Sequence, residues 1–259
     1  MNQLPQDKYE KVRSFFHGSY PNLPFIYGII DHLLPGQIWV DNENKPNNCL
    51  VMTGAAYCFM AGKLSEGEFR GYFDLLKEKE KVELAIESDS QLELSKFGFV
   101  PTARRQYRYN DIQSTIPYYE NDTNYILKKI EDEKIFNLCM WKSLVVNIFG
   151  NAENYLKNGM GFILWDSQKQ LIASEAHGVP SKELVEIGAI THEDYRGKKL
   201  STILCNHLIH YVIKKRLQPV WSCDEANVIS LKLAEKQGMD DLMKYTFHIL
   251  NKSLNKPQN

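Results

Sequence analysis

Apolar residues in the C-terminal part of the chain form short runs and longer stretches with helical spacing. A short apolar run at residues 185–191 meets a polar turn, and from Leu200 apolar residues recur close to the i, i+3, i+4 rule. A second apolar run at residues 219–223 precedes a helical stretch that opens at Asn227 and is expected to end at Gly238. This order predicts strand, turn, helix, strand and helix, which is an α/β arrangement.

Upstream of this unit the pattern predicts elements of the same kind. Residues 124–130 alternate weakly and are expected to form an opening strand, and residues 135–158 have the mixed spacing of a helical pair. Two apolar runs around a Ser-Gln-Lys turn, at 160–166 and 170–177, predict a β-hairpin. Residues 239–250 would supply the last strands.

The N-terminal part has a less regular pattern. It predicts a hairpin around an Asn- and Pro-rich loop, a polar helix, a strand, a short helix and a final strand, at residues 37–41 with 49–61, 65–79, 82–87, 91–97 and 99–109. A junction is expected at residues 114–122. The prediction is two α/β lobes, residues 1–115 and residues 116–259.

Charge and hydropathy exclude several function classes. The 259 residues include 31 Lys and Arg and 32 Asp and Glu, interspersed, so no global field favours nucleic acid or an anionic membrane. No apolar run approaches the roughly 18 residues that span a bilayer. The N-terminus lacks the charged-then-apolar pattern of a secretory signal. We therefore expect a cytoplasmic protein without nucleic-acid or membrane partners.

The cysteines give no sign of a disulfide framework or a metal site. There are five of them, an odd number, with no C-x-x-C pair and no Cys/His cluster at zinc spacing. Most lie within apolar runs, which favours buried thiols over disulfides or metal ligands. No metal is expected.

The polar turn before Leu200 carries the candidate chemistry. A strand that runs into a helix N-terminus presents free backbone N–H groups, and the helix dipole favours negative charge there. Arg196, Lys198 and Lys199 add positive charge, and Gly197 permits close approach of the backbone. This pattern predicts an anion-binding turn, with a solvated basic turn as the alternative.

Three motifs follow one another between residues 185 and 239. They are Glu-Ile-Gly-Ala-Ile-Thr at 186–191, Arg196-Gly197-Lys198-Lys199-Leu200-Ser201 at the turn, and Asn227-x-x-Ser230 with Ala234-Glu235-Lys236-Gln237-Gly238-Met239. Their order resembles the GNAT superfamily of acyl-CoA N-acyltransferases, whose turn signature is Q/R-x-x-G-x-G/A. The chain departs from that signature at Lys199, the family's central Gly, and at Ser201, its last Gly/Ala.

The resemblance implies a GNAT fold with a mixed sheet in the C-terminal half and acetyl-CoA as co-substrate. It implies acetyl transfer to a primary amine by direct attack in a ternary complex. The backbone from Gly197 to Ser201, including Leu200, would surround the pyrophosphate. By the same resemblance, the pantetheine amides would pair with Ala189, Ile190 and Thr191. Asn227 would lie near the cofactor arm, although Asn also suits a helix N-cap.

The N-terminal part shares one feature with the same family. Residues 94–109, which contain Lys96-x-Gly98-Phe99, are similar to the way a GNAT domain closes. No strand–RGxGxG–helix unit precedes them. We interpret residues up to about 115 as a smaller, degenerate GNAT-like half without its own cofactor site, with an unrelated α/β lobe as the alternative.

A general base is needed because free alkyl amines are mostly protonated at neutral pH. The resemblance points to a carboxylate on the strand at 185–191, and Glu186 is preferred because a carboxylate inside an apolar run requires an explanation. Strand alternation puts Glu183 on the opposite face, so at most one of the two faces the cleft. His177 and His192 are the alternative bases. If none of these interpretations holds for Glu186, it is an ordinary Glu on the solvated face of the strand.

The general acid cannot be assigned from the sequence. Many GNATs have a Tyr four residues before the Gly of the second helix, where this chain has Ala234; Tyr245 and Tyr195 are spare candidates. The missing Tyr favours a non-catalytic module that binds acyl-CoA or a peptide. An aminoacyl-tRNA-dependent transferase is disfavoured by the lack of a basic, aromatic stripe. The expected partner is a small-molecule or peptide amine, and a homodimer is allowed.

Overall fold

One mixed sheet runs through the whole molecule. The computed structural model describes residues 1–87, 92–109 and 124–252. Twelve strands pair in the order β1-β2-β3-β4-β5-β12-β6-β11-β10-β9-β8-β7. Their bounds are β1 (Asn2–Gln3), β2 (Gly36–Val40), β3 (Asn48–Thr53), β4 (Tyr57–Gly62), β5 (Lys81–Ile86), β6 (Val100–Arg108), β7 (Tyr125–Lys129), β8 (Met160–Asp166), β9 (Leu171–Pro180), β10 (Leu184–Thr191), β11 (Gln218–Asp224) and β12 (Asp240–Asn251).

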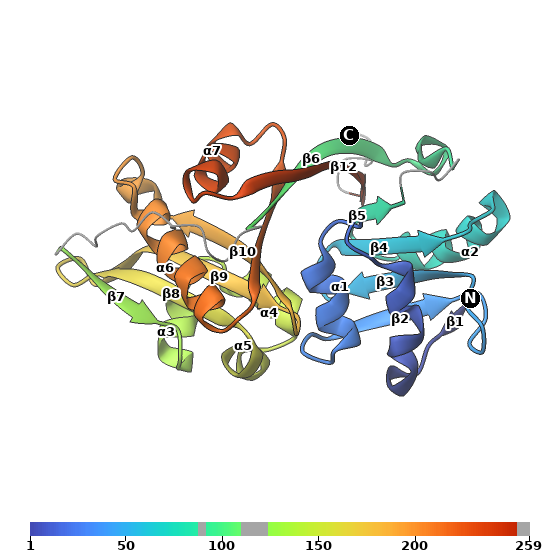
Figure 1. The fold of residues 1–259 in the computed structure, drawn as a ribbon, viewed down its shortest axis with the longest axis horizontal. Coiled ribbons are helices and arrows are strands. Elements are labelled where there is room, and N and C mark those ends of the chain that lie inside the picture. The colour runs from blue at the N-terminus through green and yellow to red at the C-terminus, as the bar shows by residue number, and fades with distance from the viewer. Residues whose placement is uncertain (88–91, 110–123, 253–259) are drawn as a thin grey trace, which may run out of the picture.

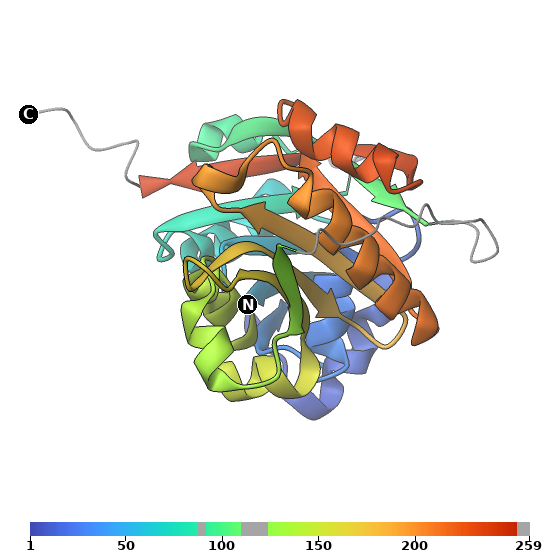
Figure 2. The ribbon, with the colours of Figure 1, turned by 90° about the vertical axis from the view of Figure 1, so that its left-hand side faces the viewer.

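Helices cover both faces of this sheet. The α-helices are α1 (Leu23–Ile30), α2 (Glu66–Leu76), α3 (Glu133–Leu138), α4 (Lys142–Phe149), α5 (Ala152–Asn158), α6 (Leu200–Lys214) and α7 (Val228–Lys236), and three 3₁₀ segments are η1 (Gln6–Phe15), η2 (Leu94–Phe97) and η3 (Glu193–Tyr195). In the C-terminal half, α6 packs on one face of β8–β10 and α3–α5 lie on the other (Figure 2).

Each half contributes a strand to the middle of the sheet. Strand β12 lies between β5 and β6, and β6 pairs with β11 on its other edge. The chain therefore sends β6 toward the C-terminal half and brings β12 back, as Figure 1 shows where the two strands cross between the halves. The N-terminal half contains the parallel pair β4–β5, which borders β12, and the C-terminal half contains the parallel pair β10–β11, which borders β6. Each half thus depends on the other for the strand beside its parallel pair. The expected boundary at 115/116 and the junction at 114–122 fall outside the described residues.

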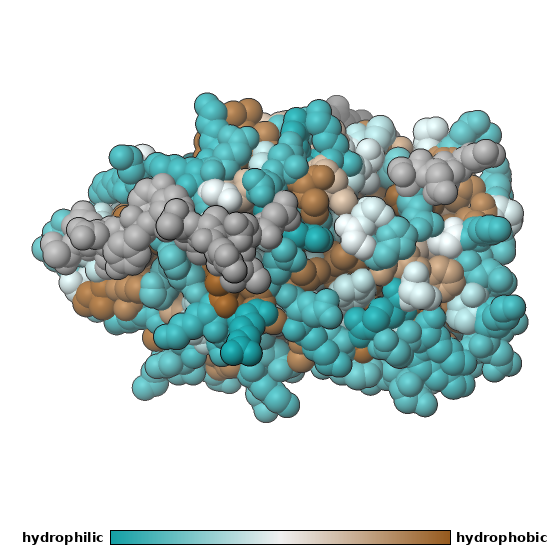
Figure 3. All heavy atoms as spheres, viewed as in Figure 1, coloured by the Kyte–Doolittle hydropathy of each residue, from teal (hydrophilic) through white to brown (hydrophobic). Residues whose placement is uncertain are grey.

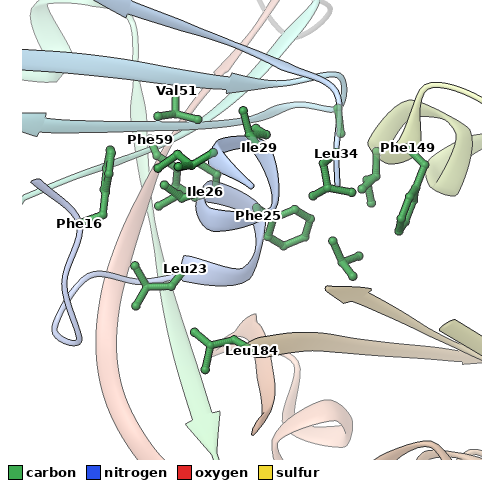
Figure 4. Close-up of a cluster of buried hydrophobic side chains, with 14 of the residues drawn as sticks. Phe16, Leu23, Phe25, Ile26, Ile29, Leu34, Val51, Phe59, Phe149 and Leu184 are labelled. Atoms are coloured by element: carbon green, nitrogen blue, oxygen red, sulfur yellow. The ribbon is translucent and has the colours of Figure 1, made fainter. Parts of the chain in front are cut away.

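Helix α1 joins the cores of the two halves. Its sequence, LPFIYGII, is almost wholly apolar, and seven of its eight residues are buried. Phe25 and Ile26 pack in one cluster with Val51 of β3, Phe149 of α4 and Leu184 of β10 (Figure 4). A helix buried on all sides has no polar face, so the pattern of apolar and polar residues could not indicate it.

Most expected elements are present, with several differences besides α1. The helical pair expected at 135–158 is three short helices, α3, α4 and α5, and the 3₁₀ helix η1 was not expected. The run at 49–61 forms two strands, β3 and β4, rather than one. Residues 239–250 form one long strand with an irregularity between Asp241 and Met243. The short helix expected at 91–97 is a 3₁₀ turn at its C-terminal end. None of the helices in the described ranges combines the length and apolar character needed to cross a bilayer.

The exchange of β6 and β12 leads to a prediction about fragments. A cut between residues 115 and 116 takes β6 away from β11 and β12, so the partner strands lose their backbone hydrogen bonds and buried contacts. Neither fragment alone should show a cooperative thermal transition, and co-expression of both should restore one. A cooperative transition of the isolated 116–259 fragment near that of the intact chain would contradict this account.

Candidate active site

Strands β10 and β11 begin as a parallel pair and then separate. Leu184, Val185 and Glu186 pair with residues 218–220 of β11, and beyond Glu186 strand β10 is paired only with β9. On its other edge, strand β11 pairs with β6 from Val220 to Asp224. Antiparallel pairing uses the backbone groups of alternate residues, so every second residue of the outer half of β10 faces the gap. Within the described residues, the backbone groups on this edge of β10 therefore have no partner strand.

The turn after β10 leads into a helix with an open N-terminus. Gly197 has φ +80°, and Lys199 adopts the left-handed conformation (φ 61°) as the N-cap of α6. No side chain caps this helix, and its first turn contains no acidic residue. The first N–H groups of a helix have no intrahelical partner, so they are available to a bound anion.

Exposed cations surround this helix N-terminus. Arg196, Lys198 and Lys199 are all exposed. The Lys198 ammonium lies 4.9 Å from the ring centroid of Tyr195, whose hydroxyl donates to Asp166 Oδ2 at 2.7 Å. The turn is thus positively charged and held from below by a buried aromatic ring, an arrangement suited to a polyphosphate.

The corresponding position in the N-terminal half is closed. There β4 and β5 pair in parallel from Tyr57 to Met60. Helix α2, which follows β4, has a complete capping box, in which Ser65 accepts from the N–H of Glu68 and the Glu68 carboxylate accepts from the N–H of Ser65. A carboxylate of the chain already occupies the position that an anion would take.

A cavity of about 150 Å³ opens on the other side of the β10–β11 separation. Its walls come from both halves of the chain. Most of the lining is apolar, and the charged side chains on it are Glu186 and Arg104. The lining residues are Asn22, Phe25, Tyr57, Arg104, Trp141, Leu144, Val145, Ile148, Phe149, His177, Val179, Glu186, Ile187, Gly188 and Ser222.

Glu186 lines this cavity at the point where the strands part. Glu186 is 7% exposed, and burial raises the pKa of its carboxyl to about 7. Hydrogen bonding to Ser222 and the charge of Arg104 act in the opposite direction and lower this pKa. Within the described part of the chain, Glu186 Oε2 has no hydrogen-bond partner. A buried carboxylate oxygen without a donor is costly, so a donor that enters the cavity would be stabilised here.

Asn22 brings a second oxygen of the same kind. It is 3% exposed, adopts φ 55° at the N-cap of α1, and lines the cavity. Its backbone N–H donates to Gln106 Oε1 at 2.7 Å, but its Oδ1 is buried without a partner among the residues placed by the structure. Two buried acceptors therefore face one largely apolar space.

His177 lines the cavity and belongs to a buried hydrogen-bond network. Its Nδ1 lies 2.8 Å from the Tyr155 hydroxyl, and its Nε2 lies 3.2 Å from Glu175 Oε1. The Glu175 carboxylate also accepts the backbone N–H groups of Met140 and Trp141, both at 2.7 Å. This network fixes the start of α4, whose Trp141 ring lies so close to Gly188 that a Cβ there would meet it at 3.1 Å.

The same network contains a set of donor atoms that the spacing rules for zinc sites did not find. Ligand atoms of Cys139, Glu175 and His177 lie within 4.8 Å of one another, close enough to hold a metal ion. Glu175 and His177 are already engaged in the hydrogen bonds above, and burial raises the pKa of the Cys139 thiol. We interpret the set as a hydrogen-bond network that positions α4. All five cysteines are buried and free, as expected.

The remaining predicted residues lie around the gap or outside it. Ala189, Ile190 and Thr191 form the half-buried outer part of β10. Asn227 is the exposed N-cap of α7, where its Oδ1 accepts the N–H of Ser230 at 3.1 Å. Two candidates lie apart from the cavity: Glu183 is exposed in the turn before β10, and His192 caps η3 by accepting from the N–H of Asp194.

The candidates for the general acid do not gather at the cavity. Ala234 is fully buried within α7. Tyr195 lies under the turn, and the Tyr245 hydroxyl accepts from Arg104 Nε at 2.9 Å. The hydroxyl-bearing aromatic residue that does line the cavity is Tyr57, whose pKa burial raises to about 12.

Sequence reasoning missed every cavity residue supplied by the N-terminal half. Asn22, Phe25, Tyr57 and Arg104 lie far from β10 in sequence, and no motif marks them. One weak signal was available. Asn22 follows a Pro and directly precedes an apolar run. Asn is mostly exposed in proteins, so its place beside a buried segment is unusual.

Comparisons with known proteins agree on one family. A family model described as GNAT acetyltransferase matches residues 13–248. An uncharacterized N-acetyltransferase of Bacillus subtilis (strain 168), YdfB, is 23% identical over 261 residues, which cover 96% of this chain and 98% of that protein.

Solved structures share the fold. A GCN5-related N-acetyltransferase-like protein from Streptococcus suis has a TM-score of 0.74 and 21% identity, and covers 93% of this chain and 98% of its own. A tandem GNAT protein from the clavulanic acid biosynthesis pathway has a TM-score of 0.62 and 10% identity, and covers 99% and 98%. These likenesses confirm the mixed α/β fold expected from the sequence.

The raised pKa of Glu186 predicts how its replacement changes stability with pH. The folded-state pKa of about 7 exceeds the ordinary value of 4.5, so ionisation opposes folding. This penalty is absent below pH 4.5, grows between 4.5 and 7, and is complete above 7. In denaturant titrations, Glu186→Gln should raise the free energy of unfolding by on the order of 3 kcal/mol at alkaline pH and hardly at all in acid. Glu183 is exposed, so Glu183→Gln should leave the free energy of unfolding unchanged at both alkaline and acid pH. An effect of Glu186→Gln that does not depend on pH would contradict the raised pKa of Glu186.

Proposed function

The chain belongs to the GNAT acetyltransferase family, and we propose that it transfers the acetyl group of acetyl-CoA to a primary amine by direct attack in a ternary complex. One observation carries this proposal. The Glu186 carboxylate, whose Oε2 has no partner among the described residues, lies where β10 and β11 separate, between the cationic turn and a cavity large enough for a small amine.

The residues around the turn and the gap fit acetyl-CoA. The pyrophosphate would accept hydrogen bonds from the backbone between Gly197 and Ser201, with Arg196, Lys198 and Lys199 adding charge. The pantetheine arm has amides that can pair with the open edge of β10 at residues 189–191, and this places the thioester end toward the cavity. The closed turn at α2 supports one such site per chain.

Glu186 is suited to remove the proton that an alkyl ammonium carries. A base works best when its pKa lies near the operating pH, and burial brings the carboxyl of Glu186 to about 7. The neutral nitrogen can then attack the thioester carbonyl carbon, and the carbon–sulfur bond breaks. The proton that the nitrogen loses as the amide forms goes to the departing thiolate, so the reaction balances without a Tyr at position 234.

A non-catalytic module that binds acyl-CoA or a peptide is the second candidate, and Ala234 is the observation that favours it. It shares the cofactor site with the enzyme but requires no base. The two candidates therefore differ in what Glu186 does, whereas the turn has the same role in both.

The cofactor site is tested at Gly197. Its φ of +80° is unfavourable for a branched side chain, and a Val there would distort the turn that carries the free N–H groups. Gly197→Val should weaken acetyl-CoA binding at least tenfold in calorimetric titration. Gly98→Val is the matched control, because Gly98 has φ +82° but lies in the other half. Equal affinity of the two variants would remove the basis for the cofactor assignment.

The base is tested by kinetics. Glu186→Gln should lower kcat by roughly a hundredfold or more, the usual contribution of general-base help, with little change in acetyl-CoA affinity. The rate of the unaltered protein should fall as the pH drops below about 7, the pKa of Glu186, because the carboxylate then takes up a proton. Thiol release from acetyl-CoA would measure both. Full activity of Glu186→Gln would place the base elsewhere, with His177 the next residue to test.

A further inference from the structure

We propose that the acceptor is a primary amine carried on an uncharged apolar body about the size of one aromatic ring, held by Asn22 and Glu186 together. This inference rests on the proposed function, because it assigns the second substrate of the same site. It also gives the N-terminal half a specific role, since Asn22 belongs to the loop that enters α1.

The two unpartnered oxygens define the polar end of the ligand. Asn22 Oδ1 and Glu186 Oε2 are both buried, both lack a donor among the described residues, and both belong to side chains that line the cavity. Each requires an N–H or O–H donor to offset the cost of its burial. A hydroxyl group offers one donor, whereas an amine or ammonium group offers two or three. An amine or ammonium group therefore carries enough donors for both oxygens.

The walls define the remainder of the ligand. Aromatic and aliphatic side chains from α1, α4, β9 and β10 surround the space, among them Phe25, Trp141, Val145, Ile148 and Val179. The volume is about 150 Å³, which is the volume at which an apolar protein cavity holds one benzene molecule. A compact hydrocarbon body fills such a space without leaving its own polar groups unpaired.

The charges on the lining exclude ligands with a second ionic group. Among the described residues that line the cavity, Arg104 carries the permanent positive charge, and its side chain is 12% exposed. Its guanidinium is already paired with Asp224 and Tyr245 and lies 4.7 Å from the ring centroid of Phe247. A ligand carboxylate would thus compete with an existing ion pair, and a second ammonium would find no carboxylate besides Glu186 on the lining.

A polar hollow offers the route by which an amine reaches the cavity. Tyr57 and Leu144 line both spaces, and the hollow beyond them has a volume of about 470 Å³. Its other residues come from the β3–β4 turn, the α2–β5 turn, the start of β5 and α4. Hydrophobic residues reach the surface between the two halves in Figure 3. The amine group can be solvated until it enters the cavity, where the two oxygens replace water.

The first experiment compares three amines that differ only at the far end of the ring. They are para-methylbenzylamine, para-(aminomethyl)benzoate and para-xylylenediamine, which end in a methyl group, a carboxylate and a second ammonium. The kcat/KM of para-methylbenzylamine should exceed that of each charged analogue at least a hundredfold. Equal or faster turnover of either charged analogue would overturn the apolar assignment while leaving acetyl transfer intact.

Binding is measured separately from turnover, so that the two proposals can fail separately. Calorimetric titrations of the same three amines are made on the intact chain saturated with coenzyme A. Selective binding of para-methylbenzylamine without any turnover would refute the proposed function and keep the ligand class. Binding of none of the three, or equal binding of all three, would overturn the ligand class.

The second experiment removes the Asn22 amide. Asn22→Gly is the suitable change because glycine accepts the φ of 55° at this position. The KM for para-methylbenzylamine should rise at least tenfold, whereas the KM for acetyl-CoA should stay unchanged. His32→Gly is the matched control, since His32 has φ 60° and is exposed at the other end of α1. An unchanged KM for the amine in Asn22→Gly, or an equal rise in His32→Gly, would remove Asn22 from the site.

Discussion

The separation of two parallel strands after three residue pairs determines the rest of the site. Strand β11 pairs with β6 along one edge from Val220 onward, whereas along its other edge it pairs with β10 only as far as Glu186. Backbone groups at the open edge of β10 are left for a ligand, because buried peptide groups require partners. The same separation opens the cavity into which Glu186 points. Under the proposed function, the early end of the β10–β11 pairing provides a place for the pantetheine arm and a place for the acceptor, with the Glu186 carboxylate between them.

The pairing of β11 with β6 also explains why the N-terminal half is present although its own anion site is closed. Strand β6 comes from that half, and Arg104 lies on it. The same half supplies Asn22, Phe25 and Tyr57 to the cavity. In this half, the capping box closes the N-terminus of α2, and β4 and β5 stay paired from Tyr57 to Met60. The N-terminal half therefore contributes side chains to the cavity but offers no second open helix N-terminus after its parallel pair.

The sequence predicted local features well and distant pairing poorly. The hairpin of β8 and β9, the strand β10 and the turn around Gly197 that leads into α6 all follow from short stretches whose period or composition is clear. The exchange of β6 and β12 could not be predicted, because it joins strands that are far apart in the chain. Nor could Asn22, since its significance depends on a missing partner that only the folded structure shows.

A crystal structure with bound coenzyme A would test the central claim most directly. The account predicts that the pyrophosphate contacts the backbone between Gly197 and Ser201, that the pantetheine lies in the gap between β10 and β11, and that the sulfur ends at the cavity beside Glu186. A cofactor bound outside that gap, or a sulfur atom pointing away from Glu186, would contradict it.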